Sequence, residues 1–277
     1  MQRKITLMQN VLKLTLAIII CLGCHSTGEK KEIANFSSSK IKIQTLGKVL
    51  FVVSNQKTYG NTTLKTSNHF GEIVYAYDVL INAGYQVDFV SPKGGEIVFG
   101  YLNQSNKTQK KYLNDKKLLN KLKYTFSPNK IDFSNYKAIY YVGGGAAMFG
   151  VPENKKIQNL AINIYEKNKG IISAICHGTA GIAHIKNSKG EYVYKGKKVS
   201  GYPDSFERTY AEYYKTFPFS IEKIISKRGG DFTYSNKRRA NYYKVDGRLI
   251  TGQDPSASAS VAQKIVEILA NQQKSNL

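Results

Sequence analysis

Short unbroken runs of apolar residues alternate along the chain with segments in which apolar residues recur at helical spacing. The first run covers residues 49–53, Val-Leu-Phe-Val-Val, as expected for a strand buried on both faces. Residues 70–83 show helical spacing that stops at Gly84, and residues 85–90 form a second apolar run. This alternation predicts βαβ units and a parallel sheet.

The same alternation returns in the second half of the chain. Residues 136–142 and 170–175 are apolar runs typical of strands, and residues 152–168 between them show the pattern of a helix. A further strand is predicted over 248–251 and a closing helix over 256–271. With no internal repeat, the order predicts one α/β domain, a three-layer sandwich with a mostly parallel, flavodoxin-like sheet.

The pattern is weaker in two other regions. Residues 96–135 are rich in Lys, Asn and Leu, and predict a surface excursion that contains a helix over 111–121. The later region predicts a hairpin over 192–200, a helical segment over 205–227, and short strands near Phe232 and Tyr243.

The charge balance raises the question of a nucleic-acid partner. The chain carries 41 Lys and Arg against 19 Asp and Glu, a net charge of +22 over 277 residues. The lysines are dispersed apart from short clusters, the longest at 237–239, and the 20 Tyr form no stacking platform. We therefore predict no nucleic-acid partner, but a solvated basic surface with weak attraction to anionic lipid.

The first residues have the features of a targeting signal. Basic residues precede an apolar run over 14–22, which is too short to span a bilayer comfortably. The run ends in Leu22-Gly23-Cys24, which resembles a bacterial lipoprotein signal although Cys21 stands where an aliphatic residue is usual. Ordinary secretion with cleavage nearby is the alternative. Either way we expect the domain to work outside the cytoplasm, in the cell envelope.

This interpretation divides the chain into three parts. Residues 1–23 are the expected signal peptide, residues 24–46 a Ser- and Lys-rich flexible tether, and residues 47–277 one catalytic domain. With Cys24 lipidated as the membrane anchor and Cys21 removed, Cys176 is the one free thiol that remains. An unpaired cysteine in an exported protein is a candidate reactive thiol.

The segment 171–181 indicates what that thiol does. An apolar, β-branched run ends abruptly in Cys176-His177-Gly178, and small residues follow. This is the pattern of a nucleophile elbow, a sharp strand-to-helix turn that exposes a reactive side chain above a parallel sheet. A neighbouring imidazole and a helix N-terminus both favour the thiolate. The simpler alternative is a buried structural cysteine beside a chance histidine.

Several motifs, taken in order, resemble the ThiJ/PfpI superfamily, which has a class I glutamine amidotransferase-like fold, and within it the branch of glyoxalase III and its heat-shock chaperone relatives. The residues that carry the resemblance are Gly71-Glu72, Ala83-Gly84-Tyr85, 91–95, 142–145, the elbow at 174–178, 196–199, 202–207 and 249–255. Together they cover about four-fifths of the chain. The expected fold follows from the resemblance, whereas the reaction is less fixed, since one fold hosts many functions.

The resemblance implies a role for each of four catalytic residues. Cys176 is the expected nucleophile and His177 its acid/base. Glu207 is expected to orient the imidazole, with Asp204 as the fallback, and Glu72 to hydrogen-bond the sulfur. Such a bond requires Glu72 to be protonated, which burial near a thiolate favours.

The glycine run at 143–145 is the expected oxyanion and substrate-binding site. It lacks the spacing of a dinucleotide site and the Lys of a P-loop, so we interpret it as close backbone approach. Backbone N–H groups near Gly144, Gly145 and His177 are expected to hold the oxyanion. The family often has His where this chain has Gly145, and this missing side chain leaves the identity of the substrate open. The family also commonly has Pro where this chain has Ala76.

The remaining histidines give no sign of a metal site. His69 lies either at the mouth of the site or in an exposed loop, and His184, among apolar neighbours, is expected to be a hydrogen-bonded core residue. Some chaperone-branch members hold a metal through two His and a carboxylate, but four His in total provide no such cluster here. We expect neither a metal nor any other cofactor.

The leading hypothesis for the function is conversion of methylglyoxal, or a similar small carbonyl, to a 2-hydroxy acid such as lactate without glutathione. The alternatives are a holdase-type stress chaperone, a Cys hydrolase or deglycase, and a thiol redox sensor. Glutamine amidotransfer is excluded, because that triad takes its histidine from far downstream and no His follows His184. Family members often dimerise, so a homodimer is also open.

Overall fold

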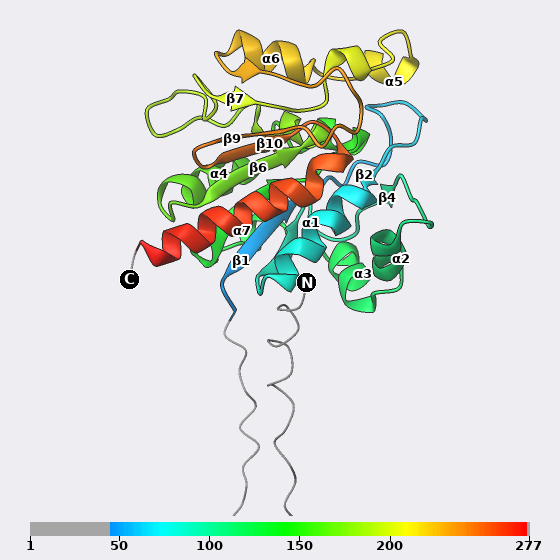
Figure 1. The fold of residues 1–277 in the computed structure, drawn as a ribbon. Coiled ribbons are helices and arrows are strands. Elements are labelled where there is room, and N and C mark those ends of the chain that lie inside the picture. Colours follow the sequence, from blue (N-terminus) through cyan, green and yellow to red (C-terminus); the bar gives the residue numbers. More distant parts are fainter. Residues whose placement is uncertain (1–44, 276–277) are drawn as a thin grey trace, which may run out of the picture. The chain divides into compact units, whose positions relative to one another are not determined.

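A six-stranded sheet organises residues 45–275, the part of the chain that the computed structural model describes (Figure 1). Every neighbouring pair is parallel except β9–β10. The five parallel strands lie in the chain order 2-1-3-4-5, which is the flavodoxin-like order and confirms the predicted fold class. Across the sheet the strands are β3 (Gln86–Val90), β1 (Lys48–Val52), β5 (Tyr136–Tyr141), β6 (Ile171–Ile175), β10 (Leu249–Gly252) and β9 (Tyr243–Asp246).

Helices cover both faces of this sheet. Helices α1 (Phe70–Asn82) and α7 (Ser258–Lys274) lie side by side on one face (Figure 1), and α4 (Lys155–Glu166) packs on the other. Alternation along the strands accounts for the two cores, since successive side chains point to opposite faces. In β1, Phe51 joins the core under α1 and α7, whereas Leu50 joins the core under α4.

The expected surface excursion at 96–135 is instead partly core. Helices α2 (Lys107–Leu113) and α3 (Lys116–Lys123) bury Tyr112, Leu118 and Leu122 against the α1 side of the sheet. The single helix predicted over 111–121 is two helices. The side chain of Asp115 accepts hydrogen bonds from two N–H groups of the next turn and so starts α3. Two short 3-10 helices, Pro128–Lys130 and Phe133–Asn135, complete the segment.

The prediction for the region 192–227 is also corrected. The hairpin over 192–200 is wrong, because β7 (Lys198–Val199) pairs in parallel with the distant strand β8 (Asp231–Phe232). The helical region consists of a 3-10 turn, Asp204–Phe206, and two short helices, α5 (Glu212–Lys215) and α6 (Ile221–Lys227). Pro218 disfavours helix at the residue before it, which separates α5 from α6.

The carboxyl ends of β1, β5 and β6 meet at one edge of the sheet, and three further 3-10 helices begin there or nearby. These are Gly145–Met148, Cys176–Ile182 and Pro255–Ala257. A two-stranded pair, β2 (Asn68–His69) and β4 (Phe99–Gly100), leads into α1. In open α/β sheets ligands bind beyond the carboxyl ends of the strands, so this edge is where a site is expected.

The expected signal peptide 1–23, Cys24 and almost all of the tether lie outside the described residues. Among the residues that are described, no helix has the length and apolar character needed to cross a membrane.

Candidate active site

The reactive cysteine lies at the turn between β6 and the 3-10 helix that follows it. Cys176 has a φ of +56°, a left-handed conformation that is strained for a side chain with a β-carbon. Its neighbours on both sides hold it there, since β6 is wholly buried and Cys176 itself is only 4 % exposed. The geometry is that of a nucleophile elbow.

His177 connects the thiol to a carboxylate. Its Nδ1 lies 3.5 Å from the sulfur of Cys176, and its Nε2 lies 2.7 Å from Oε1 of Glu207. The imidazole is stacked on the ring of Tyr202 and meets the edge of Phe217, with ring centroids 4.5 and 5.6 Å away. With Nε2 bound to Glu207, Nδ1 is the nitrogen available to exchange a proton with the sulfur.

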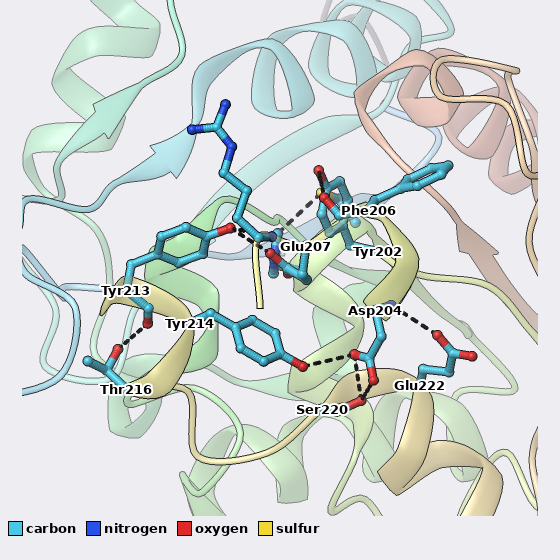
Figure 2. A network of polar contacts seen from close by, with 12 residues as sticks. Tyr202, Asp204, Phe206, Glu207, Tyr213, Tyr214, Thr216, Ser220 and Glu222 are labelled. Atoms are coloured by element: carbon cyan, nitrogen blue, oxygen red, sulfur yellow. Dashed lines mark hydrogen bonds and ion pairs between the residues drawn. The ribbon is translucent and has the colours of Figure 1, made fainter. Parts of the chain in front are cut away.

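Glu207 and Asp204 have different partners, as Figure 2 shows. The second oxygen of Glu207 accepts a hydrogen bond of 3.0 Å from the hydroxyl of Tyr213, so both of its oxygens are occupied. Asp204 instead accepts hydrogen bonds from Ser220 at 2.7 Å and Tyr214 at 3.3 Å. The structure therefore brings Glu207 to the histidine and places Asp204 in an anchor for the surrounding loops.

Glu72 approaches the thiol from the other side. It lies in the first turn of α1, is fully buried, and accepts a hydrogen bond of 2.7 Å from the backbone N–H of Gly143 through Oε2. Burial raises the pKa of this carboxyl to about 8, while hydrogen bonds from Cys176 and Gly143 act in the opposite direction. The carboxyl is consequently protonated at neutral pH and can donate to the sulfur.

The thiol and this carboxyl share their ionisation. Burial raises the pKa of Cys176, a negative charge on Glu72 raises it further, and the backbone N–H of His177 lowers it. Two adjacent buried negative charges are unfavourable, so the pair carries at most one. A proton on Glu72 is thus the condition under which Cys176 becomes a thiolate.

The glycines at 143–145 allow the backbone to approach this pair closely. A β-carbon at Gly143 would lie 2.6 Å from Oε2 of Glu72, and one at Gly144, where φ is +93°, would lie 2.5 Å from the carbonyl oxygen of Ser67. A β-carbon at Gly145 would lie 2.5 Å from the hydroxyl of Tyr59. Of the residues expected to hold the oxyanion, Gly144 and His177 border the cavity with Cys176, whereas Gly145 lies behind Tyr59.

The cavity above the thiol has a volume of about 390 Å³. Besides the predicted residues it is lined by six aromatic side chains and three arginines: Tyr59, Tyr101, Tyr202, Phe206, Tyr213, Phe217, Arg208, Arg238 and Arg239. Sequence reasoning did not assign these residues to the site. Tyr202 and Phe206 stand in the motif 202–207 and the basic cluster at 237–239 was visible, but the others come from separate loops and carry no local signal.

The two other described histidines take separate places. His69 lines the cavity, accepts a hydrogen bond from the N–H of Glu72 as the cap of α1, and stacks on Tyr101 at 4.7 Å. Burial lowers the pKa of His69 to about 4, so it is neutral at pH 7. His184 is half-buried beside Arg228, 3.1 Å away. Within residues 45–275 no three His, Cys, Asp or Glu side chains are grouped as metal ligands.

Comparison with known proteins gives consistent results. The model of the DJ-1/PfpI family matches residues 68–268. The glutathione-independent glyoxalase hsp3102 of Schizosaccharomyces pombe is 29 % identical over 218 residues, which cover 74 % of this chain and 89 % of the relative. Glyoxalase 3 of Candida albicans is 25 % identical, covering 79 % of this chain and 96 % of that protein.

Solved structures agree with these matches. The Rapid Encystment Protein of 24 kDa from Francisella tularensis superposes with a TM-score of 0.74 at 30 % identity, covering 80 % of this chain and 99 % of that one. The glyoxalase III structure from Candida albicans has a TM-score of 0.73 at 22 % identity, which supports the shared fold.

Proposed function

This chain belongs to the DJ-1/PfpI family, and from that premise we propose that it is a glutathione-independent glyoxalase acting on a small α-oxoaldehyde such as methylglyoxal. The observation that carries the proposal is the position of Cys176, between a protonated Glu72 and the His177–Glu207 pair, at the floor of a cavity. The names of the relatives favour this activity over the holdase and hydrolase alternatives.

The first step is addition of the Cys176 sulfur to the aldehyde carbon. The C–S bond forms, the carbonyl π-bond breaks, and its oxygen takes a proton to give a hemithioacetal. Backbone N–H groups of the glycine run and a proton from Glu72 are available to the developing oxyanion. Glu72 has this role because its carboxyl is neutral at pH 7 and faces the sulfur.

His177 then moves a proton between two carbons. Its Nδ1 removes the proton from the former aldehyde carbon, an enediol forms, and the proton returns to the neighbouring carbon. The aldehyde carbon is thereby oxidised to a thioester while the ketone carbon is reduced to an alcohol. Glu207 supports the step, since a carboxylate 2.7 Å from Nε2 fixes the tautomer and stabilises the imidazolium.

Hydrolysis completes the cycle. Water adds to the thioester carbon, the C–S bond breaks, and the products are the 2-hydroxy acid and the restored thiol. The net reaction adds one water to the α-oxoaldehyde, and no external oxidant or reductant takes part.

Lactate formation in D₂O without glutathione tests this proposal. The full chain supplied with methylglyoxal should produce lactate with deuterium at C2, because an enediol exchanges the migrating proton with solvent. Lactate without deuterium would show that the proton moves without exchange with solvent and would leave the proposed function intact. No lactate, beside an active glyoxalase control in the same buffer, would contradict the proposed function.

We also propose that Cys24 carries a lipid that anchors the enzyme in the cell envelope. Support comes from the sequence: a basic start, a short apolar run, and Leu22-Gly23-Cys24. Expression of the full chain in a bacterium should yield a lipid-modified Cys24 by mass spectrometry and a membrane-bound product. The Cys24→Ser variant should be released, whereas Cys21→Ser should not, and an unmodified soluble product would favour ordinary secretion.

We also propose that the protein forms a homodimer, because members of the family often dimerise. Light scattering of the purified protein tests it directly. A measured mass of twice the chain mass of 31.0 kDa, less any cleaved signal peptide, would support a dimer. A measured mass equal to that of one chain would contradict it.

A further inference from the structure

We propose that Arg239 and Arg208 select α-oxoaldehydes that carry a carboxylate at the end remote from the aldehyde. The inference rests on the proposed glyoxalase activity and adds the substrate class. Both arginines line the cavity that also contains Cys176 and His177. The chemistry they recognise is a planar, singly charged oxyanion, which the fork of an arginine binds through two hydrogen bonds.

The cavity is larger than methylglyoxal requires. Five non-hydrogen atoms occupy on the order of 150 Å³ if each takes about the volume of a water molecule, roughly 30 Å³. The cavity of about 390 Å³ leaves more than half of its volume for the remainder of a longer substrate. That remainder would contact the aromatic side chains and arginines that line the cavity.

The three arginines of the cavity are not equivalent. Arg238 donates to the hydroxyl of Tyr202 at 2.9 Å and to the carbonyl of Phe206 at 2.6 Å, and its guanidinium lies 4.6 Å from the Phe206 ring. Within residues 45–275, the guanidinium groups of Arg208 and Arg239 have no hydrogen bond or ion pair with the protein. Arg238 is therefore a structural contact, whereas the other two have donors available to a ligand.

The two carboxylates at the cavity do not neutralise these arginines by contact. Asp254 accepts hydrogen bonds from the backbone N–H of Arg239 and Ser256, the Ser256 hydroxyl and the Gln253 amide. Glu207 is bound to His177 and Tyr213. Three guanidinium charges against two carboxylates leave one net positive charge, 3 − 2, which one substrate carboxylate balances and a phosphate dianion exceeds.

The loop that presents Arg239 is strained and firmly held. Arg239 and Asn241 both have left-handed backbones, with φ of +57° and +51°, a conformation that costs non-glycine residues about 1 kcal/mol or more each. Buried Gln253 accepts from the N–H of Ser235 at 2.7 Å, and the Ser256 hydroxyl accepts from the N–H of Asn241 at 2.9 Å. Strain that the surroundings maintain in this way is typical of a functional position.

Arg239 also borders a second cavity, of about 520 Å³, which shares His69 and Tyr101 with the first. The His69 ring, neutral at pH 7, adds no charge of its own there. A carboxylate bound to Arg239 would thus lie where the two cavities adjoin.

Two five-carbon substrates of matched length test the inference. 4,5-Dioxopentanoate carries the terminal carboxylate and would become 2-hydroxyglutarate, whereas 2-oxopentanal is neutral and would become 2-hydroxypentanoate. The native chain should show kcat/KM at least tenfold higher for the charged substrate, as expected for charge-assisted hydrogen bonds. Arg239→Gln should reduce that ratio about tenfold, chiefly because the charged substrate binds less tightly and its KM rises. Arg208→Gln should reduce the ratio less.

Lys237→Gln is the matched control, since Lys237 is exposed in the same loop but does not line the cavity. It should leave the ratio within about twofold of the native value. A native ratio near one would overturn the inference. So would an equal loss in Lys237→Gln and Arg239→Gln, because the general positive field of the chain would then account for the preference.

Binding of the two products separates this inference from the proposed function. Calorimetry with 2-hydroxyglutarate and 2-hydroxypentanoate requires no turnover, so it applies even if neither aldehyde reacts. Weaker binding of 2-hydroxyglutarate by about tenfold in Arg239→Gln, with Lys237→Gln unchanged, supports the anion site. Equal Kd values for both products in the native chain contradict it, whatever the result for lactate formation.

Discussion

The floor and the rim of the active-site cavity are built in opposite ways. At the floor, Cys176 and Glu72 are buried, and their polar contacts are few. At the rim, arginines and tyrosines from separate loops are exposed or half-exposed. The floor fixes protonation states, where a low dielectric makes each contact strong, and the rim offers charge and aromatic surface to a ligand.

This difference shows which part of the molecule determines the reaction and which the substrate. Moving one proton between Glu72 and Cys176 changes the chemistry, because a negative charge on Glu72 raises the pKa of the Cys176 thiol. Changing a rim residue alters what the cavity binds while the floor stays intact. Substitutions at the floor should therefore act on kcat, and substitutions at the rim on KM.

The largest effect among the variants that keep the nucleophile is expected at Glu207. Glu207→Gln removes the carboxylate that fixes the His177 tautomer, so kcat should fall about 10²- to 10⁴-fold. Steady-state kinetics with methylglyoxal measures this loss.

Asp204→Asn is the matched control, three residues away, since Asp204 binds Ser220 and Tyr214 instead of the histidine. It should lower the free energy of unfolding by about 1 kcal/mol and change kcat by no more than a few fold. Equal kinetic losses in the two variants would remove Glu207 from its role.

The pH dependence should follow Glu72. Its carboxyl has a pKa of about 8, so activity should fall as pH rises through that value, because a charged Glu72 raises the pKa of Cys176 and has no proton to donate. Glu72→Gln keeps a donor but cannot titrate, so kcat should be about 10- to 100-fold lower and the fall above pH 8 should disappear. A native profile that stays flat from pH 7 to 9.5 would contradict the assignment.

The same residue has a consequence for stability. The folded state holds a proton on Glu72 that the unfolded state releases between about pH 4.5 and 8, so native stability falls as pH rises through this window. Because of this one group, we expect the free energy of unfolding to be about 3 kcal/mol lower at pH 7 than at pH 4. Chemical denaturation at a series of pH values measures the free energy of unfolding of the native chain and of Glu72→Gln. Plotted against pH, the two free energies should diverge by that amount between pH 4 and pH 7, and parallel plots would contradict the prediction.

A smaller effect is expected where the rim supports the floor. Tyr213→Phe removes the 3.0 Å hydrogen bond to Glu207, together with the 3.2 Å bond that the hydroxyl accepts from the backbone N–H of Arg208. A neutral donor to a carboxylate contributes about 1 kcal/mol or slightly more, so kcat should fall about three- to tenfold. Tyr214→Phe, which loses a bond to Asp204, should not lower kcat and serves as the control.

The smallest effect is expected at Arg238. Arg238→Gln loses the contacts to Tyr202 and Phe206 and frees the Tyr202 ring that stacks on His177. We expect KM for methylglyoxal to rise about threefold with little change in kcat, as measured by initial rates. A loss confined to kcat would place Arg238 with the floor instead of the rim.

The two regions also differ in how far the sequence predicts them. The parallel sheet follows from the alternation of apolar runs and helical patterns. The elbow also follows from a local pattern, because Cys176 and His177 are adjacent and follow an apolar strand. Glu72 and Glu207 are distant in the sequence, and only the family resemblance suggested them. Tyr59 and Arg208 could not be predicted as site residues, since loops brought together by the fold leave no periodicity in the sequence.

The errors in the fold have two causes, one long-range and one local. The hairpin predicted over 192–200 failed because β7 pairs with β8 some thirty residues on, a long-range choice that local alternation does not encode. The helix predicted over 111–121 failed at Asp115, whose capping bonds begin a new helix inside an otherwise helical pattern. The excursion at 96–135 contributes Tyr112 to the core, because helix α2 packs on α1.

The most direct test compares lactate production from methylglyoxal by the native full chain and by Cys176→Ala, without glutathione or any other added thiol. Matching near-ultraviolet circular dichroism spectra would show that the two proteins share their packing. The account predicts lactate from the native chain and none above background from the variant. Lactate from both proteins at similar rates would contradict the central role of Cys176.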